Sequence, residues 1–256
     1  MKIGVVGLGL IGGSIFKGLK AKGFDVKGVS QSQQGESIYK NYDVLKDCEV
    51  VFVCSAMNKT LSVLDELEKY LKPETLVTDV CSLKEFVCKK QRPYNFIPSH
   101  PMAGTEHQGF ENSFPELFEG AKWAITPAFG TNDITKLIQI IQILGANPII
   151  TKPELHDEAV AMISHMPMVI SQALFAAAEE NPLALDLASS GFRDMTRLAM
   201  SNTELAEDMV SMNSKNIEHA ILKLYKSVGD LITSDYSAKI KKIKDKRSKM
   251  FEISNF

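Results

Sequence analysis

The chain has few of the features that mark metal-binding, secreted or nucleic-acid-binding proteins. It contains one tryptophan and four cysteines in 256 residues, and its 29 basic and 31 acidic side chains leave a formal charge of −2. Cys48, Cys54, Cys81 and Cys88 form no pair of CxxC motifs, so we expect buried structural thiols and no metal site. A nearly neutral chain has no long-range field that would attract nucleic acid or an anionic membrane.

Long hydrophobic runs are also missing. No segment approaches the ~18 consecutive apolar residues that span a bilayer. The first residues enter a strand pattern directly, without the charged stretch and cleavage site of a signal peptide. We therefore expect a cytoplasmic protein whose partner is a small molecule, with neither nucleic acid nor a membrane as a partner.

The first 150 residues or so alternate short apolar segments with longer amphipathic ones, a rhythm typical of a parallel sheet with crossover helices. The amphipathic stretches predict helices over 14–21, 60–70 and 131–144. The apolar segments predict strands near Ile3–Val6, Val26–Val29, Val50–Cys54, Leu76–Asp79, Phe96–Pro98, Trp123–Thr126 and Pro148–Ile150.

Beyond Lys152-Pro153 the strand signals stop, and residues 157–180, 183–188 and 203–226 have helical spacing. We predict an α/β domain over residues 1–152 and an all-helical domain over residues 153–256. The helical part carries more apolar positions than a single thin layer hides, which predicts a homodimer through this domain. The basic stretch Lys239–Lys249 contains Ile240 and Ile243 at helical spacing, which favours a solvated helix face over a nucleic-acid site.

A glycine-rich turn follows the first predicted strand and opens a helix, the context that a dinucleotide fingerprint requires. We expect the first glycine to make the tight turn, the second to let the backbone approach a pyrophosphate, and the third to permit close helix–strand packing. Free N–H groups and the helix dipole would then hold the phosphates. The predicted architecture is thus a Rossmann-type doubly wound sheet, with cofactor contacts from Gly7, Leu8, Gly9, Leu10, Ile11 and Gly12.

The end of the second predicted strand bears on the choice of cofactor. An acidic residue there would bind the ribose hydroxyls of NAD, but this strand ends in Ser30, Gln31 and Ser32. These side chains can donate hydrogen bonds to a 2′-phosphate, although no arginine accompanies them. The cofactor is therefore NAD or NADP, with a slight preference for NADP. Cys54, Ser55 and Asp79, at the ends of the next two strands, are further candidates for cofactor contacts.

Two polar segments follow strand ends, where ligands of open α/β sheets bind. Ser82 lies just beyond the fourth strand, and could be a helix cap, a catalytic group or both. His100 lies between a serine and a proline after the fifth strand, and its reference pKa near ~6.5 makes it a general-base candidate.

These segments resemble the prephenate/arogenate dehydrogenase family of tyrosine biosynthesis over nearly the whole chain. The likeness rests on five motifs in the same order: Val77-Thr78-Asp79-Val80-Cys81-Ser82-Leu83-Lys84, Ser99-His100-Pro101-Met102-Ala103-Gly104-Thr105-Glu106, Leu155-His156-Asp157, Ile163-Ser164-His165-Met166-Pro167, and the stretch from Ser189 to Ala199 that contains Arg193 and Arg197. The resemblance implies an NAD(P)-dependent dehydrogenase that oxidises and decarboxylates prephenate or its amino counterpart arogenate.

The resemblance also assigns roles. His100 matches the catalytic histidine that accepts the ring-hydroxyl proton. Ser82 matches a serine that hydrogen-bonds both the substrate hydroxyl and this histidine. Arg197 matches an arginine that binds a substrate carboxylate, a task suited to a planar bidentate group. His165, Thr105, Glu106 and Met168 are further candidates for substrate contacts, and His156 is expected to orient its surroundings at the domain junction. On one helix Arg193 would share a face with Arg197, and it has Asp194 or Glu106 as possible ion-pair partners.

The substrate and the reaction class are left with alternatives. Members that favour prephenate often read Ser-His-x-Pro-His, whereas this chain has Met168 in the last position, as in the arogenate-using branch; we name prephenate first because its use is the more widespread. A 3-hydroxyacid or 6-phosphogluconate type of dehydrogenase would need a lysine in the helical domain, and none is well placed before Lys215. A non-catalytic dinucleotide-binding module would leave His100, Ser82 and Arg197 with structural roles only.

Overall fold

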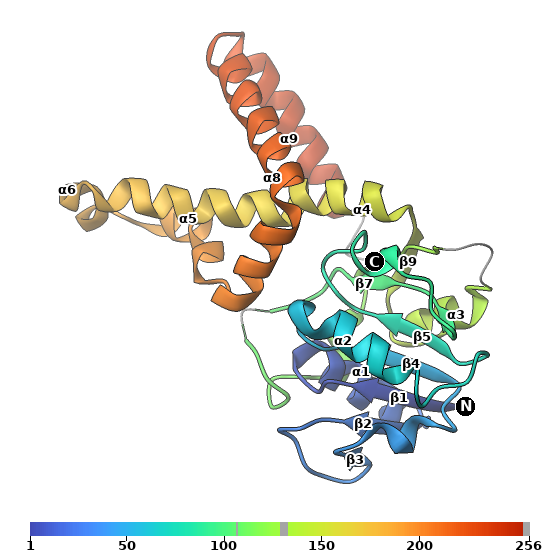
Figure 1. Ribbon diagram of the computed structural model, residues 1–256. Helices are drawn as coiled ribbons and strands as arrows, with labels where there is room; N and C mark the ends of the chain where they lie inside the picture. The colour runs from blue at the N-terminus through green and yellow to red at the C-terminus, as the bar shows by residue number, and fades with distance from the viewer. Residues whose placement is uncertain (106, 129–132, 253–256) are drawn as a thin grey trace.

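The computed structural model describes residues 1–105, 107–128 and 133–252, and it divides into an α/β part and a helical part (Figure 1). The α/β part contains a six-stranded parallel sheet in the order β3-β2-β1-β4-β5-β6. Its strands are β1 (Lys2–Val6), β2 (Asp25–Val29), β3 (Ile38–Tyr39), β4 (Val50–Val53), β5 (Leu76–Asp79) and β6 (Asn95–Phe96). The predicted doubly wound sheet is confirmed.

Helices cover both faces of this sheet, which explains why its central strands are continuously apolar. On one face α1 (Leu10–Ala21) and α3 (Thr135–Ile143) contribute Ile15, Leu19 and Ile140 to a core that includes Trp123. On the other face α2 (Met57–Leu67) contributes Leu64 and Leu67. The two cores hold the carboxyl ends of β1, β4 and β5 in one row.

The strand predicted near Phe96–Pro98 is present as β6 but ends at Phe96, and the later predicted strands lie outside the large sheet. The chain leaves the large sheet after β6 and enters a second sheet of β7 (Ser99–Pro101), β8 (Lys122–Ile125) and β9 (Asn147–Ile150), in which β7 runs antiparallel to β8. Pro98 separates the two: it has no N–H to donate, and its carbonyl accepts from the Thr126 amide at 2.9 Å. His100 therefore lies within a strand and not on a loop.

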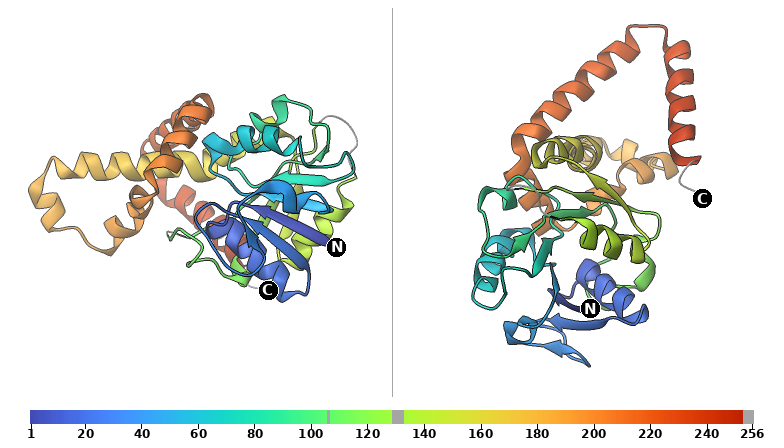
Figure 2. Two further views of the ribbon diagram at one scale, coloured as in Figure 1. Left: turned by 60° about the horizontal axis from the view of Figure 1, so that its bottom comes forward. Right: turned by 90° about the vertical axis from the view of Figure 1, so that its right-hand side faces the viewer.

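The helical part begins with one nearly straight rod, in which α4 (Pro153–Val160), a π-helical turn η4 (Ala161–His165) and α5 (Met166–Glu179) follow one another (Figure 1). Two short helices, α6 (Pro182–Asp186) and α7 (Ser190–Met195), and the turn η5 (Arg197–Met200) lead to α8 (Thr203–Ile232) and α9 (Tyr236–Glu252). The α5–α6 end of the rod and the tip of the α8–α9 hairpin project away from the α/β part in Figure 1, and the right-hand view of Figure 2 shows the projecting hairpin again.

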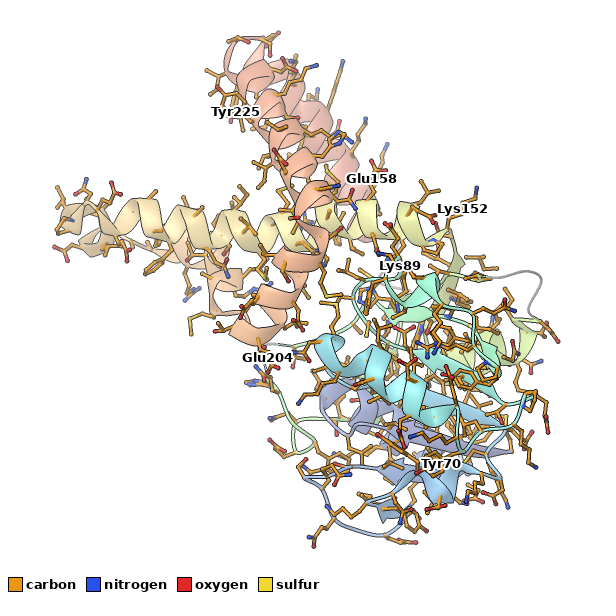
Figure 3. The ribbon with its side chains drawn as sticks, viewed as in Figure 1. Tyr70, Lys89, Lys152, Glu158, Glu204 and Tyr225 are labelled. Atoms are coloured by element: carbon orange, nitrogen blue, oxygen red, sulfur yellow. The ribbon has the colours of Figure 1, made fainter. Side chains whose placement is uncertain are left out.

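The rod bears on the expectation that no segment of the chain is long and apolar enough to span a membrane. Residues Pro153–Glu179 form one 27-residue helix that is long and apolar enough to cross a bilayer by length and composition alone, and 33% of its most apolar window is buried within the protein. Other exposed apolar side chains lie on the hairpin, among them Leu222 and Tyr225, which are 61% and 79% exposed. Figure 3 shows Tyr225 on the distal half of α8. Uncovered helix faces of this kind also suit packing against a second copy.

The two parts are packed against each other. Met57, Cys81 and Leu83 from the α/β part share an apolar cluster with Val160, Met168 and Met209 from the helices. Beside it, the amides of Asn58 donate to Glu204 and Asp208 at the start of α8, both at 3.2 Å. Figure 3 shows Glu204 at this end of α8, beside α2. The junction therefore lies at the carboxyl edge of the large sheet.

Candidate active site

The turn between β1 and α1 has the geometry expected of the glycine motif. Gly7 adopts φ +88°, and a Cβ there would lie 2.6 Å from the Cys54 carbonyl oxygen. A Cβ on Gly12 would lie 1.9 Å from the Gly7 carbonyl oxygen, whereas one on Gly9 would meet nothing within 4 Å. The tight turn predicted at Gly7 and the close helix–strand packing predicted at Gly12 are therefore confirmed, and the role predicted for Gly9 stays a prediction. Among the described residues no side chain caps the start of α1, so its first N–H groups are left without a side-chain acceptor and can bind a phosphate.

The loop after β2 places a cation that the sequence analysis did not consider. The Ser30 hydroxyl accepts from the Gln33 amide at 3.1 Å and lies 3.4 Å from the Ser32 hydroxyl. Lys40, directly after β3, donates its ammonium to the carbonyls of Gln31 and Gln33 at 2.7 and 3.0 Å. Because β3 pairs with β2, this ammonium lies at the carboxyl end of β2. Pairing over two residues gives too little periodicity to recognise in the sequence.

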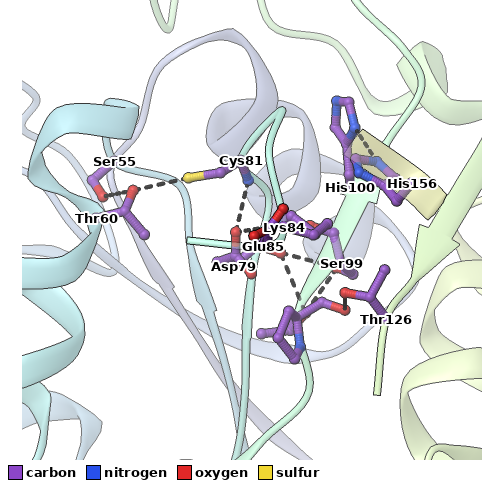
Figure 4. A network of polar contacts seen from close by, with 12 residues as sticks. Ser55, Thr60, Asp79, Cys81, Lys84, Glu85, Ser99, His100, Thr126 and His156 are labelled. Atoms are coloured by element: carbon purple, nitrogen blue, oxygen red, sulfur yellow. Dashed lines mark hydrogen bonds and ion pairs between the residues drawn. The ribbon is translucent and has the colours of Figure 1, made fainter. Parts of the chain in front are cut away.

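Asp79, predicted to contact the cofactor, lies beneath the site instead. Its side chain is fully buried, and one carboxylate oxygen accepts from the Lys84 ammonium and, at 3.0 Å, from the Cys81 amide (Figure 4). Lys84, also fully buried, donates to the Ser99 carbonyl at 2.7 Å. A carboxylate enclosed in this way has no surface to offer a dinucleotide. The buried ion pair ties the end of β5 to β7.

Cys54 and Ser55, the remaining cofactor candidates, lie half-buried after β4. The Ser55 hydroxyl lies 3.1 Å from that of Thr60, which in turn lies 2.9 Å from the Cys81 sulfur. Burial raises the pKa of Cys81 to about 12 and that of Cys54 well above its ordinary value. Both thiols therefore stay protonated, as expected of structural cysteines.

His100 is joined to the helical part by a chain of hydrogen bonds (Figure 4). Its Nδ1 lies 3.0 Å from Nε2 of His156, and Nδ1 of His156 lies 2.7 Å from the Asp157 carboxylate. That carboxylate also accepts the backbone amides of Lys84 and Glu85 at 2.8 and 2.9 Å. Pro153 at the first position of α4 starts the helix that brings His156 and Asp157 to β7. The role expected of His156 at the domain junction agrees with these contacts.

The surroundings of His100 favour its neutral form. Burial lowers its pKa well below 6.5, and the positive charges that His156, Lys84 and His165 can carry act in the same direction. A neutral imidazole keeps one nitrogen lone pair, which a general base needs. The structure therefore provides a proton acceptor where the large sheet, the small sheet and α4 meet.

Arg197 lies apart from this chain of contacts. Together with Met168 and Ser164 it lines a cavity of about 300 Å³ at the helical side of the junction. Leu198, its neighbour, packs against the apolar cluster that includes Cys81 and Met168, and Met102, two residues after His100, packs against the same cluster. In the described residues no hydrogen bond joins Arg197 to His100.

Arg193 and Arg197 do not share a helix face as predicted. The α7 helix ends at Met195, and Thr196, with φ −104° and ψ 7°, separates it from η5, which carries Arg197. Arg193 is exposed and pairs with Asp194 at 3.7 Å, one of the two partners foreseen. A helix break between two residues that match a helical spacing cannot be recognised from the spacing alone.

The other predicted side chains have differing surroundings. The Ser82 hydroxyl has no hydrogen-bond partner among the described residues, and no helix begins at Ser82, so the helix-cap interpretation is wrong. His165 is fully buried, its Nδ1 accepts from Asn213 at 3.1 Å, and its Nε2 has no partner in the described part of the chain. Burial lowers its pKa to about 4. Thr105 is exposed, and Glu106 lies outside the described residues.

Comparison with known proteins gives the family. The sequence profile of the prephenate dehydrogenase nucleotide-binding domain matches residues 19–150, and that of the prephenate dehydrogenase dimerization domain matches residues 152–243. A prephenate dehydrogenase of Bacillus subtilis is 29% identical over 238 residues, which are 83% of this chain and 64% of that protein.

Solved structures agree over nearly the full length. Arogenate dehydrogenase of Synechocystis superposes with a TM-score of 0.84 at 31% identity, covering 98% of this chain and 100% of that one. Prephenate dehydrogenase of A. aeolicus, in complex with hydroxyphenyl propionate and NAD⁺, gives 0.82 at 26% identity, covering 99% and 98%. With its Rossmann-type turn and two matched domains, the chain is an NAD(P)-dependent oxidoreductase that belongs to the prephenate dehydrogenase family.

Proposed function

We propose that the protein oxidises and decarboxylates prephenate to 4-hydroxyphenylpyruvate, with His100 as the catalytic base. The observation that carries this proposal is the imidazole of His100, held at the domain junction 3.0 Å from His156, where burial lowers its pKa and favours the neutral form. Arogenate, which would give tyrosine directly, is the second candidate. The similarity to Synechocystis arogenate dehydrogenase and Met168 in the substrate cavity favour it.

The chemistry asks little of the protein beyond placement. The free imidazole nitrogen of His100 takes the ring-hydroxyl proton, and the nicotinamide, when bound, accepts hydride from the same carbon. The Ser82 hydroxyl, which has no partner among the described residues, can hydrogen-bond the substrate oxygen. Arg197, in the cavity wall, can bind a substrate carboxylate through its guanidinium. We keep His165 as a candidate pocket residue because its buried Nε2 has no partner among the described groups.

We infer that NADP is favoured over NAD. No carboxylate side chain follows β2 where one would bind the ribose hydroxyls, and Ser30, Gln31 and Ser32 stand there instead. Lys40 adds a positive charge at the carboxyl end of β2, where its ammonium donates to two backbone carbonyl oxygens. A 2′-phosphate could replace those carbonyls as its partner. The cradle formed by Gly7, Gly9 and Gly12 fits the pyrophosphate of either cofactor.

We also propose that two copies associate through the helical part. The dimerization-domain match over residues 152–243 and the exposed apolar faces of α5, α8 and α9 support this arrangement. The same association would cover the apolar rod Pro153–Glu179, which favours a cytoplasmic protein over a membrane-spanning one. The division between residues 152 and 153 is supported by the end of β9 at Ile150 and the start of α4 at Pro153.

A four-way steady-state assay, pairing prephenate and arogenate with NAD and NADP, tests these proposals together. We expect reduced cofactor and carbon dioxide in equal amounts, with a higher kcat/KM for NADP than for NAD. Turnover of arogenate alone would move the assignment to the second candidate. Absence of turnover with both substrates and both cofactors would overturn the proposed function.

A further inference from the structure

We propose that His156 and Asp157 are positioning residues that fix the tautomer of His100, so that its Nε2 is the nitrogen that exchanges a proton with the substrate. The inference rests on the proposed function for the identity of the substrate, but the tautomer itself can be measured without turnover. Nδ1 of His100 lies 3.0 Å from Nε2 of His156, and Nδ1 of His156 lies 2.7 Å from the Asp157 carboxylate.

The direction of each hydrogen bond follows from Asp157. A carboxylate can only accept, and this one faces three N–H donors, two of them backbone amides that cannot reverse. Nδ1 of His156 must therefore carry a hydrogen. In a neutral His156 ring Nε2 is then an acceptor, so Nδ1 of His100 carries the hydrogen that bonds to it. The lone pair of His100 is left on Nε2.

The packing of the domain junction holds His156 and Asp157 in the positions that these hydrogen bonds require. His156 and Asp157 are each less than 5% exposed, and the rings of His100 and His156 meet edge to face at 5.2 Å between centroids. The Asp157 carbonyl accepts from Asn213 at 3.0 Å, and this asparagine lies at the kink of α8, where φ is −122°. Both ends of Asp157 are thus fixed, one by the backbone after β5 and the other by α8.

The reaction gives a reason for such a device. The hydroxyl O–H bond breaks as hydride leaves the same carbon for the nicotinamide, and carbon dioxide then departs, leaving its bonding electrons in the ring. The oxygen that lost its proton ends as the phenol oxygen, so the proton held on His100 can return to it, and no net proton is consumed. A base that also serves as the acid needs Nε2 facing one oxygen in both steps.

The first test is the tautomer, measured by long-range ¹H–¹⁵N correlation on cofactor-free protein labelled at its five histidines. The His100→Asn protein assigns the His100 signals. We expect a protonated Nδ1 and an unprotonated Nε2 at neutral pH, and a shift towards the Nε2–H form in His156→Leu. An Nε2–H ring in the unmodified protein would overturn the proposal. If the tautomer is as expected and no substrate turns over, only the proposed function fails.

The second test compares two substitutions of His156. In His156→Gln the amide oxygen can still accept from Nδ1 of His100, whereas His156→Leu offers no acceptor. We expect kcat to fall about 10–100-fold in His156→Leu and only a few-fold in His156→Gln, with similar KM values. Equal losses in both would assign His156 to packing alone. Thermal melting and cofactor affinity of both variants, with His219→Gln on the exposed face of α8 as control, separate these effects from misfolding.

The pH profile supplies a readout that packing would not move. Charged or titratable groups that face His100 are His156 on α4, Lys84 after β5 and His165 on η4. A neutral His156 that accepts a hydrogen bond stabilises protonated His100, so its loss in His156→Leu should move the acidic limb of kcat/KM to lower pH. A limb that moves to higher pH would mean that His156 acts as a repelling positive charge, and would overturn the proposal.

Discussion

The α/β half and the helical half of the molecule differ in how much of their apolar and charged surface finds a partner within one chain. In the α/β half, even a buried ammonium has partners: Lys84 is held by Asp79 and a backbone carbonyl. In the helical half, large apolar side chains such as Leu187 and Tyr225 are more than 70% exposed. The α/β half completes its core within one chain, whereas the helical half presents faces that a second copy would cover. We therefore expect substitutions in the α/β half to impair catalysis, and substitutions on the exposed helical faces to impair association of two copies.

The largest expected effect is loss of the dimer after substitutions in the helical half. Replacing Leu222 and Tyr225 on α8 by aspartate places charges on the face we assign to self-association. Burial of one such side chain contributes about 1.5–3 kcal/mol, and a two-fold interface contains each change twice, so we expect the dimer dissociation constant to rise by at least about 100-fold. Light scattering across a dilution series measures it. Leu61→Asp, which alters an equally apolar exposed residue on α2, is the matched control and should leave the dimer intact.

The next effect tests the α/β half. In His100→Asn the general base is lost while the glycine turn is untouched, so turnover should fall by ~10²-fold or more and NADPH should still bind. Rapid-mixing kinetics and cofactor fluorescence measure the two quantities on one preparation. Turnover at the original rate would remove His100 from the mechanism.

Arg197→Ala asks whether the helical half contributes to the site. Loss of a charge-assisted contact worth about 1.5–3 kcal/mol should raise KM roughly 10–100-fold, with a smaller change in kcat. Arg197→Lys keeps the charge but not the planar pair of donors. Its KM should therefore lie between that of the unmodified protein and that of Arg197→Ala. A KM that stays at the original value in both variants would assign Arg197 to a structural role.

The smallest effect concerns cofactor choice at the edge of the α/β half. Lys40→Ala removes the cation that we place beside a 2′-phosphate, and should weaken binding of 2′,5′-ADP about tenfold while binding of 5′-AMP stays the same. Titration calorimetry of the cofactor-free protein measures both ligands. Lys22→Ala, on an exposed lysine at the end of α1, is the control. Equal weakening of both ligands would mean that Lys40 only supports the loop.

Local signals made much of the fold predictable. Strand β5 lies at the predicted residues, and the glycine turn has the predicted conformation, because each depends on neighbours in sequence. Errors occurred where a distant partner decided the outcome. β7 became a strand because β8 was available to pair with it, and the Asp79 carboxylate was enclosed because Lys84 folds back onto it. The helix break at Thr196, which separated two arginines that match a helical spacing, is a local feature and a separate case.

By itself the sequence determined the class of fold, the dinucleotide turn and, through five motifs, the family. These are properties of local periodicity and of residue identity at short spacing. Only the tertiary structure decided that the imidazole of His100 meets His156 and Asp157, that Lys40 stands at the end of β2, and that Arg197 lines a separate cavity wall. The physical reason is that hydrogen bonds and ion pairs act over about 3 Å, and pairs separated by 56 residues acquire that distance only when the chain folds.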